Sequence, residues 1–112
     1  MNQCPEELKE LFRTVYKLSD SQIELFYYLC DKEEKRVNEI AEDLGKSRST
    51  VQRLLKSLLS VNIIKRKSQT YSSNKKGRYY LYSVVEKENL KEKLKERVNE
   101  WRDEKIEMLK YI

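Results

Sequence analysis

Apolar residues recur every three or four positions near the start of the chain, which is the spacing of one face of an α-helix. Residues 4–18 hold the first such segment, with a proline near its beginning, where a helix tolerates one. Ser19 followed three residues later by Gln22 is a capping-box pattern, which indicates that a second helix begins there and runs to about Asp31. The pattern therefore predicts two helices in this part of the chain.

Two further segments with helical spacing lie close together. Residues 36–44 have apolar positions on one face and are followed by Gly45, a residue type that commonly closes helices. Ser47 suits the N-cap of the next helix, residues 48–60. The buried face of this helix is expected to comprise Val51, Leu54, Leu55 and Leu58. The pattern thus predicts two helices joined by a very short turn.

The period changes after the fourth helix. Residues 63–71 and 78–85 are rich in Ile, Tyr and Val and read as two β-strands, and the polar segment between them reads as a hairpin turn. Residues 86–112 return to a helical pattern. We therefore expect a mainly α fold with a small β-hairpin (α+β), divided into a domain of residues 1–85 and a long C-terminal helix of residues 86–112.

Composition excludes several classes of protein. A chain of 112 residues suits one compact domain. No apolar run approaches the length of a membrane span, and the N-terminus lacks the layout of a signal peptide, so a cytoplasmic location is expected. The chain has no histidine, no glycine-rich phosphate loop and no evident pair of catalytic carboxylates, so we expect neither an enzyme nor a bound metal or cofactor.

The two cysteines, Cys4 and Cys30, are far apart in the sequence and belong to no metal-binding motif. Two reduced thiols are the default for a protein inside the cell. A disulfide is the alternative if the first two helices run antiparallel, because that arrangement brings the start of one near the end of the other.

Charge is distributed unevenly along the chain. The formal net charge is only +5, yet residues 44–85 contain no Asp or Glu and ten Lys or Arg. A segment without internal neutralisation projects a positive field, which favours a polyanionic partner such as nucleic acid. A solvated surface would show mixed signs, as the final helix does with eight basic and eight acidic residues.

Two helices joined by a tight turn, the second with a basic N-terminal half, form a helix-turn-helix, and a hairpin directly after them makes it a winged one. A major groove admits one α-helix, whose Arg and Gln side chains bind guanine and adenine edges, while hydroxyls and Lys suit phosphates. We therefore expect DNA contacts from residues 48–60 in the major groove and from a wing of residues 72–78 on the flanking backbone or minor groove. The candidate DNA-binding residues are Lys46, Ser47, Arg48, Ser49, Thr50, Gln52, Arg53, Lys56, Lys75, Lys76 and Arg78.

The segments EIAEDLG, SRSTVQRLLKSL and IIKR, together with KKGRYYLYSVV, resemble the DNA-reading part of archaeal winged-helix transcriptional regulators of the TrmB and MarR-like type. The resemblance covers residues 22–85 and implies DNA binding by the residues named above. The SVN stretch, residues 60–62, departs from the family, which has a glycine-containing turn after the recognition helix. TrmB proteins often carry a sugar-sensing domain, which a chain of 112 residues is too short to contain.

The apolar positions of residues 86–112 fit alternating spacings of four and three, as in helices that pair with one another. A single helix of this length extends beyond a small winged-helix core, so we expect it to form a homodimer; packing on its own domain is the alternative. Trp101 is the expected anchor. The candidate dimerisation residues are Leu90, Leu94, Val98, Trp101, Met108 and Leu109.

Together these patterns predict a homodimeric transcriptional regulator that binds specific double-stranded DNA sequences. One alternative is a nucleoid-type protein that coats DNA without specificity. Others are an accessory factor for RNA or single strands, and a winged helix used for protein–protein assembly in a transcription or replication complex. The operator, the sign of regulation and any small-molecule effector leave no signal in the sequence.

Overall fold

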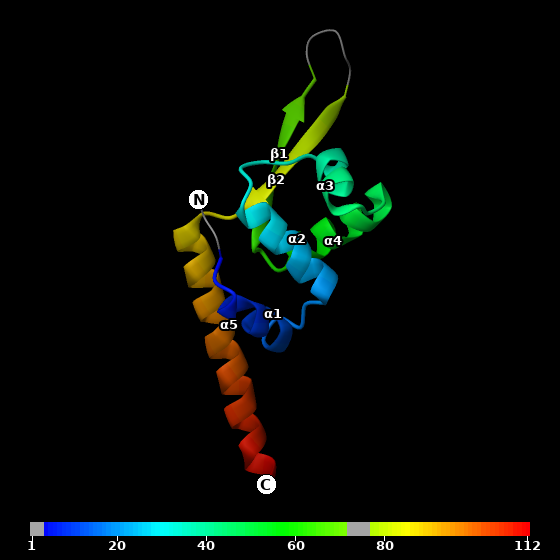
Figure 1. Cartoon of the computed structure of the whole chain (residues 1–112). Coiled ribbons are helices and arrows are strands. Elements are labelled where there is room, and N and C mark those ends of the chain that lie inside the picture. The colour runs from blue at the N-terminus through cyan, green and yellow to red at the C-terminus, as the bar shows by residue number, and fades with distance from the viewer. Residues whose placement is uncertain (1–3, 72–76) are drawn as a thin grey trace.

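The computed structural model describes residues 4–71 and 77–112 of the chain. This part of the chain forms helices and one two-stranded antiparallel sheet, which confirms the predicted α+β class and the winged helix-turn-helix with a long C-terminal helix (Figure 1). The elements in order are α1 (Glu7–Thr14), α2 (Asp20–Cys30), α3 (Val37–Leu44), α4 (Arg48–Ser60), β1 (Ile64–Thr70), β2 (Arg78–Val84), α5 (Lys87–Met108) and the 3-10 helix η1 (Leu109–Tyr111).

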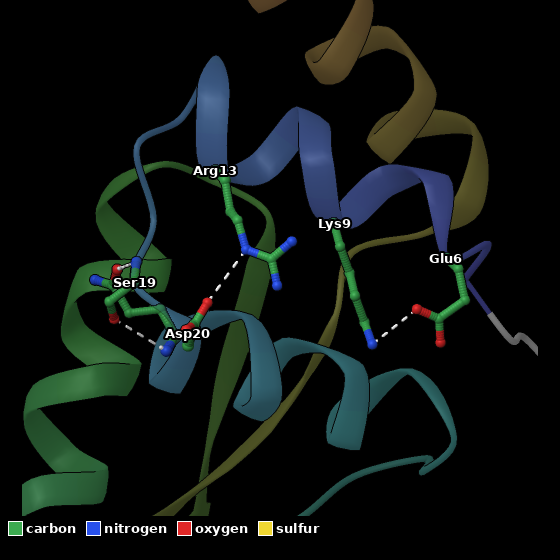
Figure 2. Close-up of polar contacts among 6 residues, drawn as sticks. Glu6, Lys9, Arg13, Ser19 and Asp20 are labelled. Atoms are coloured by element: carbon green, nitrogen blue, oxygen red, sulfur yellow. Dashed lines mark hydrogen bonds and ion pairs between the residues drawn. The ribbon is translucent and has the colours of Figure 1, made fainter.

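The predicted capping box is present at the start of α2. The Ser19 hydroxyl accepts a hydrogen bond from the Gln22 backbone N–H at 3.3 Å, and the Gln22 side-chain oxygen accepts one from the Ser19 N–H at 2.6 Å. Figure 2 shows this cap beside an ion pair from α1, in which Arg13 Nε lies 3.2 Å from Asp20 Oδ1. The cap satisfies backbone groups at the start of α2, and the exposed ion pair adds one contact between the two helices.

The hydrophobic core is formed by side chains of α1, α2, α3 and α4, together with the hairpin and the first half of α5. Rings from α1 and α2 meet edge to face, with the centroids of Phe12 and Phe26 4.8 Å apart. Each fully buried aliphatic or aromatic side chain contributes about 1.5–3 kcal/mol relative to an exposed one. The largest fully buried side chains are Phe12, Val51, Leu25, Phe26, Leu29, Ile40, Leu55, Leu58 and Ile63.

The turn between α3 and α4 has the predicted caps. Gly45 has φ of +63°, a left-handed conformation that a glycine adopts without a steric cost. Two residues later the Ser47 hydroxyl accepts a hydrogen bond from the Thr50 backbone N–H at 3.2 Å. The predicted apolar face of α4 is buried as expected, at Val51, Leu54, Leu55 and Leu58.

The corner after α4 forms without a glycine. Asn62 adopts φ of +64°, and asparagine is one of the few residue types with a side chain that tolerate this conformation. Its backbone N–H donates to the carbonyl of Leu59 at 3.0 Å. The departure from the family pattern at residues 60–62 therefore leaves the chain reversal into β1 intact.

A single isolated bridge, which the sequence did not reveal, joins the two-stranded sheet to the connector before α3. β1 and β2 pair in an antiparallel register from Ile64 opposite Val84 to Thr70 opposite Arg78. On the other side of β2, Lys35 exchanges two backbone hydrogen bonds with Tyr82, of 3.0 and 2.8 Å. The charged connector before α3 is therefore joined to the edge of the hairpin.

The C-terminal helix begins on the domain and then leaves it. Leu90 and Leu94, in the first half of α5, are buried in the common core, and the Tyr16 hydroxyl donates to the Lys93 carbonyl at 3.4 Å. The second half of α5 runs past α1, away from the hairpin, with no other element beside it (Figure 1). The molecule is consequently elongated, 65 Å along its longest axis and 27 Å across. Among the helices described, none is long and apolar enough to cross a membrane.

Candidate nucleic-acid interface

The N-terminal half of α4 presents polar and basic side chains on the face opposite its buried leucines. The backbone positions of these residues follow from the helical period, since the leucines fix which face packs on the core. The cap hydroxyl of Ser47 precedes them and Thr50 is half-buried between them. The exposed members of this surface, which we call the α4 outer face, are Arg48, Ser49, Gln52, Arg53 and Lys56.

Hydroxyl groups cluster at the N-terminus of α4. The Ser47 oxygen lies 2.8 Å from the Thr50 hydroxyl and 3.3 Å from the Ser49 hydroxyl. The first backbone N–H groups of a helix have no partner within the helix, and the helix dipole places partial positive charge at this end. This end of α4 is therefore suited to bind a phosphate group through N–H and O–H donors.

The cations of the α4 outer face have no acidic partner in the described part of the chain. No ion pair there involves Arg48, Arg53 or Lys56, which are exposed, or the half-buried Lys46 just before the helix. Charges in this state remain available to an external anion.

The basic residues of β1 are in a different situation, because each has a partner. Lys65 forms an ion pair with Glu86, and this hydrogen bond lowers the pKa of the glutamate. Lys67 Nζ lies 3.1 Å from Glu34 Oε2. The Arg66 guanidinium lies 4.2 Å from the centroid of the Tyr80 ring. The acid-free segment thus divides into a paired group on the strand and an unpaired group on α4.

Only part of the predicted wing is described. Arg78 is exposed at the first position of β2, opposite Thr70, at the end of the hairpin away from the core. Lys75 and Lys76 lie outside the described residues. The structure therefore places one of the three wing residues, on the same hairpin that Lys35 joins to the helix-turn-helix.

The tyrosines of β2 alternate between the two faces as the strand period requires. Tyr82 is buried and Tyr80 half-buried, which agrees with packing of that face against the helices. On the other face Tyr79 stacks on Arg36, whose guanidinium carbon lies 4.2 Å from the ring centroid. The sequence pattern does not point to Arg36, because nothing local distinguishes an arginine in a charged connector from its neighbours.

The predicted dimerisation residues occupy three environments. Leu90 and Leu94 are buried in the core of their own chain, and Val98 and Trp101 are half-buried. The remaining two, Met108 and Leu109, are 57% and 60% exposed. The exposed large apolar side chains are Ile106, Met108, Leu109, Tyr111 and Ile112, and we call this set the C-terminal apolar surface.

A groove of about 1040 Å³ runs between the end of α2, the hairpin and the first half of α5. The sulfur atoms of Cys4 and Cys30 lie 2.6 Å apart in its wall as free thiols, and burial raises the pKa of Cys30. Within the parts of the chain that the structure describes, no group of three or more His, Cys, Asp or Glu side chains is arranged to hold a metal ion.

Comparison with known proteins gives a family and a fold. A family model described as the sugar-specific transcriptional regulator TrmB matches residues 12–88. Two uncharacterized proteins of Methanocaldococcus jannaschii are each 29% identical to the chain; the alignments cover 81% and 84% of this chain and 67% and 76% of the relatives.

Two solved structures share the fold. A possible transcriptional regulator from Methanosarcina mazei superposes with a TM-score of 0.79 at 20% identity, covering 93% of this chain and 87% of that one. A protein from the thermoacidophilic archaeon Sulfolobus tokodaii superposes with a TM-score of 0.68, also at 20% identity, covering 87% and 93%.

Proposed function

Because the chain belongs to the TrmB family of transcriptional regulators, we propose that it is a sequence-specific reader of double-stranded DNA that acts in the cytoplasm and catalyses no reaction. The observation that carries this proposal is the α4 outer face, whose cations are exposed and have no acidic partner in the described chain. When DNA binds such a surface, counterions are released from the DNA, and this release increases the affinity. The same charges gain no such binding energy while the surface remains in water.

In this proposal the N-terminal half of α4 enters the major groove. The side chains nearest that end reach the base edges first, so Arg48, Gln52 and Arg53 are assigned to bases. The hydroxyls of Ser47, Ser49 and Thr50, together with the ammonium groups of Lys46 and Lys56, are assigned to the flanking phosphates.

The wing supplies the second contact. Arg78 is exposed on the hairpin, and Lys75 and Lys76 precede it in the sequence. We assign these three cations to the DNA backbone or minor groove beside the α4 site. They contribute affinity and salt dependence, whereas the α4 side chains contribute base specificity.

We also propose that the protein acts as a homodimer through α5. The C-terminal apolar surface is uncovered on a helix that extends beyond its own domain, and contiguous exposed apolar side chains mark interaction sites. A two-fold dimer would place two α4 helices on half-sites about one helical turn of DNA apart, roughly 34 Å, so the operator would be palindromic.

The deciding experiment is selection of bound duplexes from a random pool, followed by measurement of affinity for the selected sequence over a range of salt concentrations. Enrichment of a palindrome, with affinity that falls steeply as salt rises, is the expected result. Binding without enrichment would instead make the protein a nucleoid-type coat. Binding that ignores salt, or no binding to duplex DNA, would contradict the proposal and favour protein–protein assembly.

A further inference from the structure

Arg36 joins the start of α3 to both strands of the hairpin. Its guanidinium carbon lies 4.2 Å from the centroid of Tyr79 on β2 and 5.7 Å from that of Tyr71, which follows β1. The two rings are 5.0 Å apart, and Arg36 Nη2 lies 3.5 Å from the Tyr71 hydroxyl. One side chain thus touches two aromatic rings that are far apart in the sequence.

The position of Arg36 is unusual for a cation. It is the N-cap residue of α3, where Ser, Thr, Asp and Asn are preferred and where the helix dipole disfavours positive charge. Its backbone N–H is satisfied by Glu39 Oε1 at 2.9 Å, yet in the described ranges no carboxylate forms an ion pair with its guanidinium. The guanidinium instead contacts the two tyrosines, through their rings and the hydrogen bond to the Tyr71 hydroxyl.

The positions of the two rings allow this contact to fix the orientation of the hairpin. Tyr79 is the second residue of β2, and Tyr71 directly follows Thr70, so both lie at the end of the described strands that is farther from the core. The Lys35–Tyr82 pairing attaches the same hairpin at a second point. That point is three residues from Tyr79 toward the core, about 10 Å along β2. Two separated points of attachment fix a direction, whereas one alone would act as a hinge.

We infer that Arg36 is a positioning residue, which holds the hairpin of β1 and β2 at a set angle to α3 and α4 so that the hairpin and α4 contact the same DNA. This inference rests on the proposed function. In this inference Arg36 acts through Tyr71 and Tyr79, whose rings its guanidinium faces, rather than on a phosphate.

A double-mutant cycle tests the inference. Arg36→Ala is measured in the wild-type chain and in a wing-neutral chain carrying K75A, K76A and R78A, on the selected duplex at several salt concentrations. Arg66→Ala is the matched control, because Arg66 stacks on Tyr80 at the same 4.2 Å but is itself part of the hairpin. Arg36→Lys keeps the charge but loses the planar group that stacks on both rings.

In the wild-type chain, Arg36→Ala and Arg36→Lys are expected to weaken binding about tenfold and to reduce the salt slope toward that of the wing-neutral chain. In the wing-neutral chain, Arg36→Ala should change neither quantity. Arg66→Ala should leave most of the affinity in place. Hydrogen exchange of the free protein should rise around residues 69–71 and 77–79 in the Arg36→Ala variant more than in the control, which tests the attachment without DNA.

Three results would overturn the inference. Equal losses in both backgrounds, rescued by Arg36→Lys, would mean that Arg36 binds DNA directly. A lower melting temperature with an unchanged salt slope would mean a structural role only. A wing-neutral chain that binds like wild type would overturn the wing contact, and the inference with it; unlike the other two, this result counts against the proposed function as well.

Discussion

Arg48 and Arg53 differ from Arg13, Arg66 and Arg97 in what surrounds their charges. Arg13 pairs with Asp20, Arg97 with Glu100, and Arg66 stacks on a tyrosine, whereas the two arginines of α4 are exposed and have no such partner in the described chain. An exposed ion pair is worth about 0–1 kcal/mol, so the difference matters little for stability. It matters for binding, because an unpaired guanidinium has no intramolecular contact to give up.

Replacing Arg48 or Arg53 with alanine is expected to weaken binding to the selected duplex by about 2 kcal/mol, roughly thirtyfold, as the loss of a bidentate contact to guanine would. Binding to random DNA should weaken much less. Arg13→Ala is the control, since it removes an equal charge from α1. Fluorescence anisotropy on both duplexes measures the two affinities, and an equal loss on both would identify a non-specific binder instead.

The second residue-scale feature is the cysteine pair, for which the sequence left two alternatives. The segment before α1 and the end of α2 bring the sulfurs of Cys4 and Cys30 to 2.6 Å from each other, in the wall of the groove described above. Both thiols are free in this structure. Burial raises the pKa of Cys30, which disfavours its thiolate and makes spontaneous oxidation slow.

Diamide should nevertheless convert the pair to an intramolecular disulfide, in which two thiols lose two hydrogen atoms and the diamide becomes its hydrazine. Closing a loop of this length should stabilise the fold by about 3 kcal/mol, seen as a higher melting temperature. Mass spectrometry and thiol titration follow the reaction. Cys30→Ser is the control, and an intermolecular product in the wild-type chain would show that the two thiols do not meet in solution.

At the scale of single elements, α4 has a buried face that packs on the core and an exposed face that we propose binds DNA. Its N-cap residue, Ser47, contributes both to helix stability and to the proposed DNA contact. The Ser47 hydroxyl satisfies the Thr50 N–H, which stabilises the helix, and it also borders the N-terminus assigned to phosphate. A substitution that keeps the cap but adds a negative charge separates the contribution to helix stability from the contribution to DNA binding.

Ser47→Ala is expected to lower the free energy of unfolding by about 1 kcal/mol through loss of the cap. Ser47→Asp should keep most of that stability, because aspartate is an equally good cap and suits the helix dipole. The aspartate should nevertheless bind DNA at least tenfold more weakly, because it repels phosphate. Urea unfolding and DNA titration on both variants give the comparison; an aspartate variant that binds like wild type would remove α4 from the interface.

At the scale of the whole molecule, the chain is a winged domain with a helix projecting from it. The first half of α5 belongs to the domain through Leu90 and Leu94, and these two residues are therefore less available to a second chain than the sequence pattern suggested. The uncovered part is the C-terminal apolar surface. A dimer through this surface would leave the hairpin and α4 of each chain free to reach DNA, because α5 runs away from both (Figure 1).

A chain carrying both Met108→Asp and Leu109→Asp is expected to be monomeric, because each aspartate would have to lose its hydration in an apolar interface. The selected palindrome should then bind much more weakly, while affinity for a single half-site stays the same. Asn99→Asp, an exposed polar position on the same helix, is the control. Sedimentation analysis reports the mass, and an unchanged dimer would direct attention to Val98 and Trp101.

The sequence by itself determined the helices and strands and the basic, polar character of the exposed face of α4. Helical spacing, the Ser19 and Ser47 caps and Gly45 are local signals, because each depends on residues within one or two turns. The acid-free run of residues 44–85 is likewise visible without coordinates. These signals were enough to predict the winged helix-turn-helix, and the family match agrees with them.

Only the tertiary structure decided how these elements are attached to one another. The Lys35–Tyr82 pairing, the stacking of Arg36 on Tyr79 and the burial of Leu90 each join residues that are distant in the sequence. Neither period nor composition encodes which distant side chains meet, because that depends on how several elements pack at once. The sequence could therefore predict the surface that we propose binds DNA, but not the contacts that join the hairpin to α3.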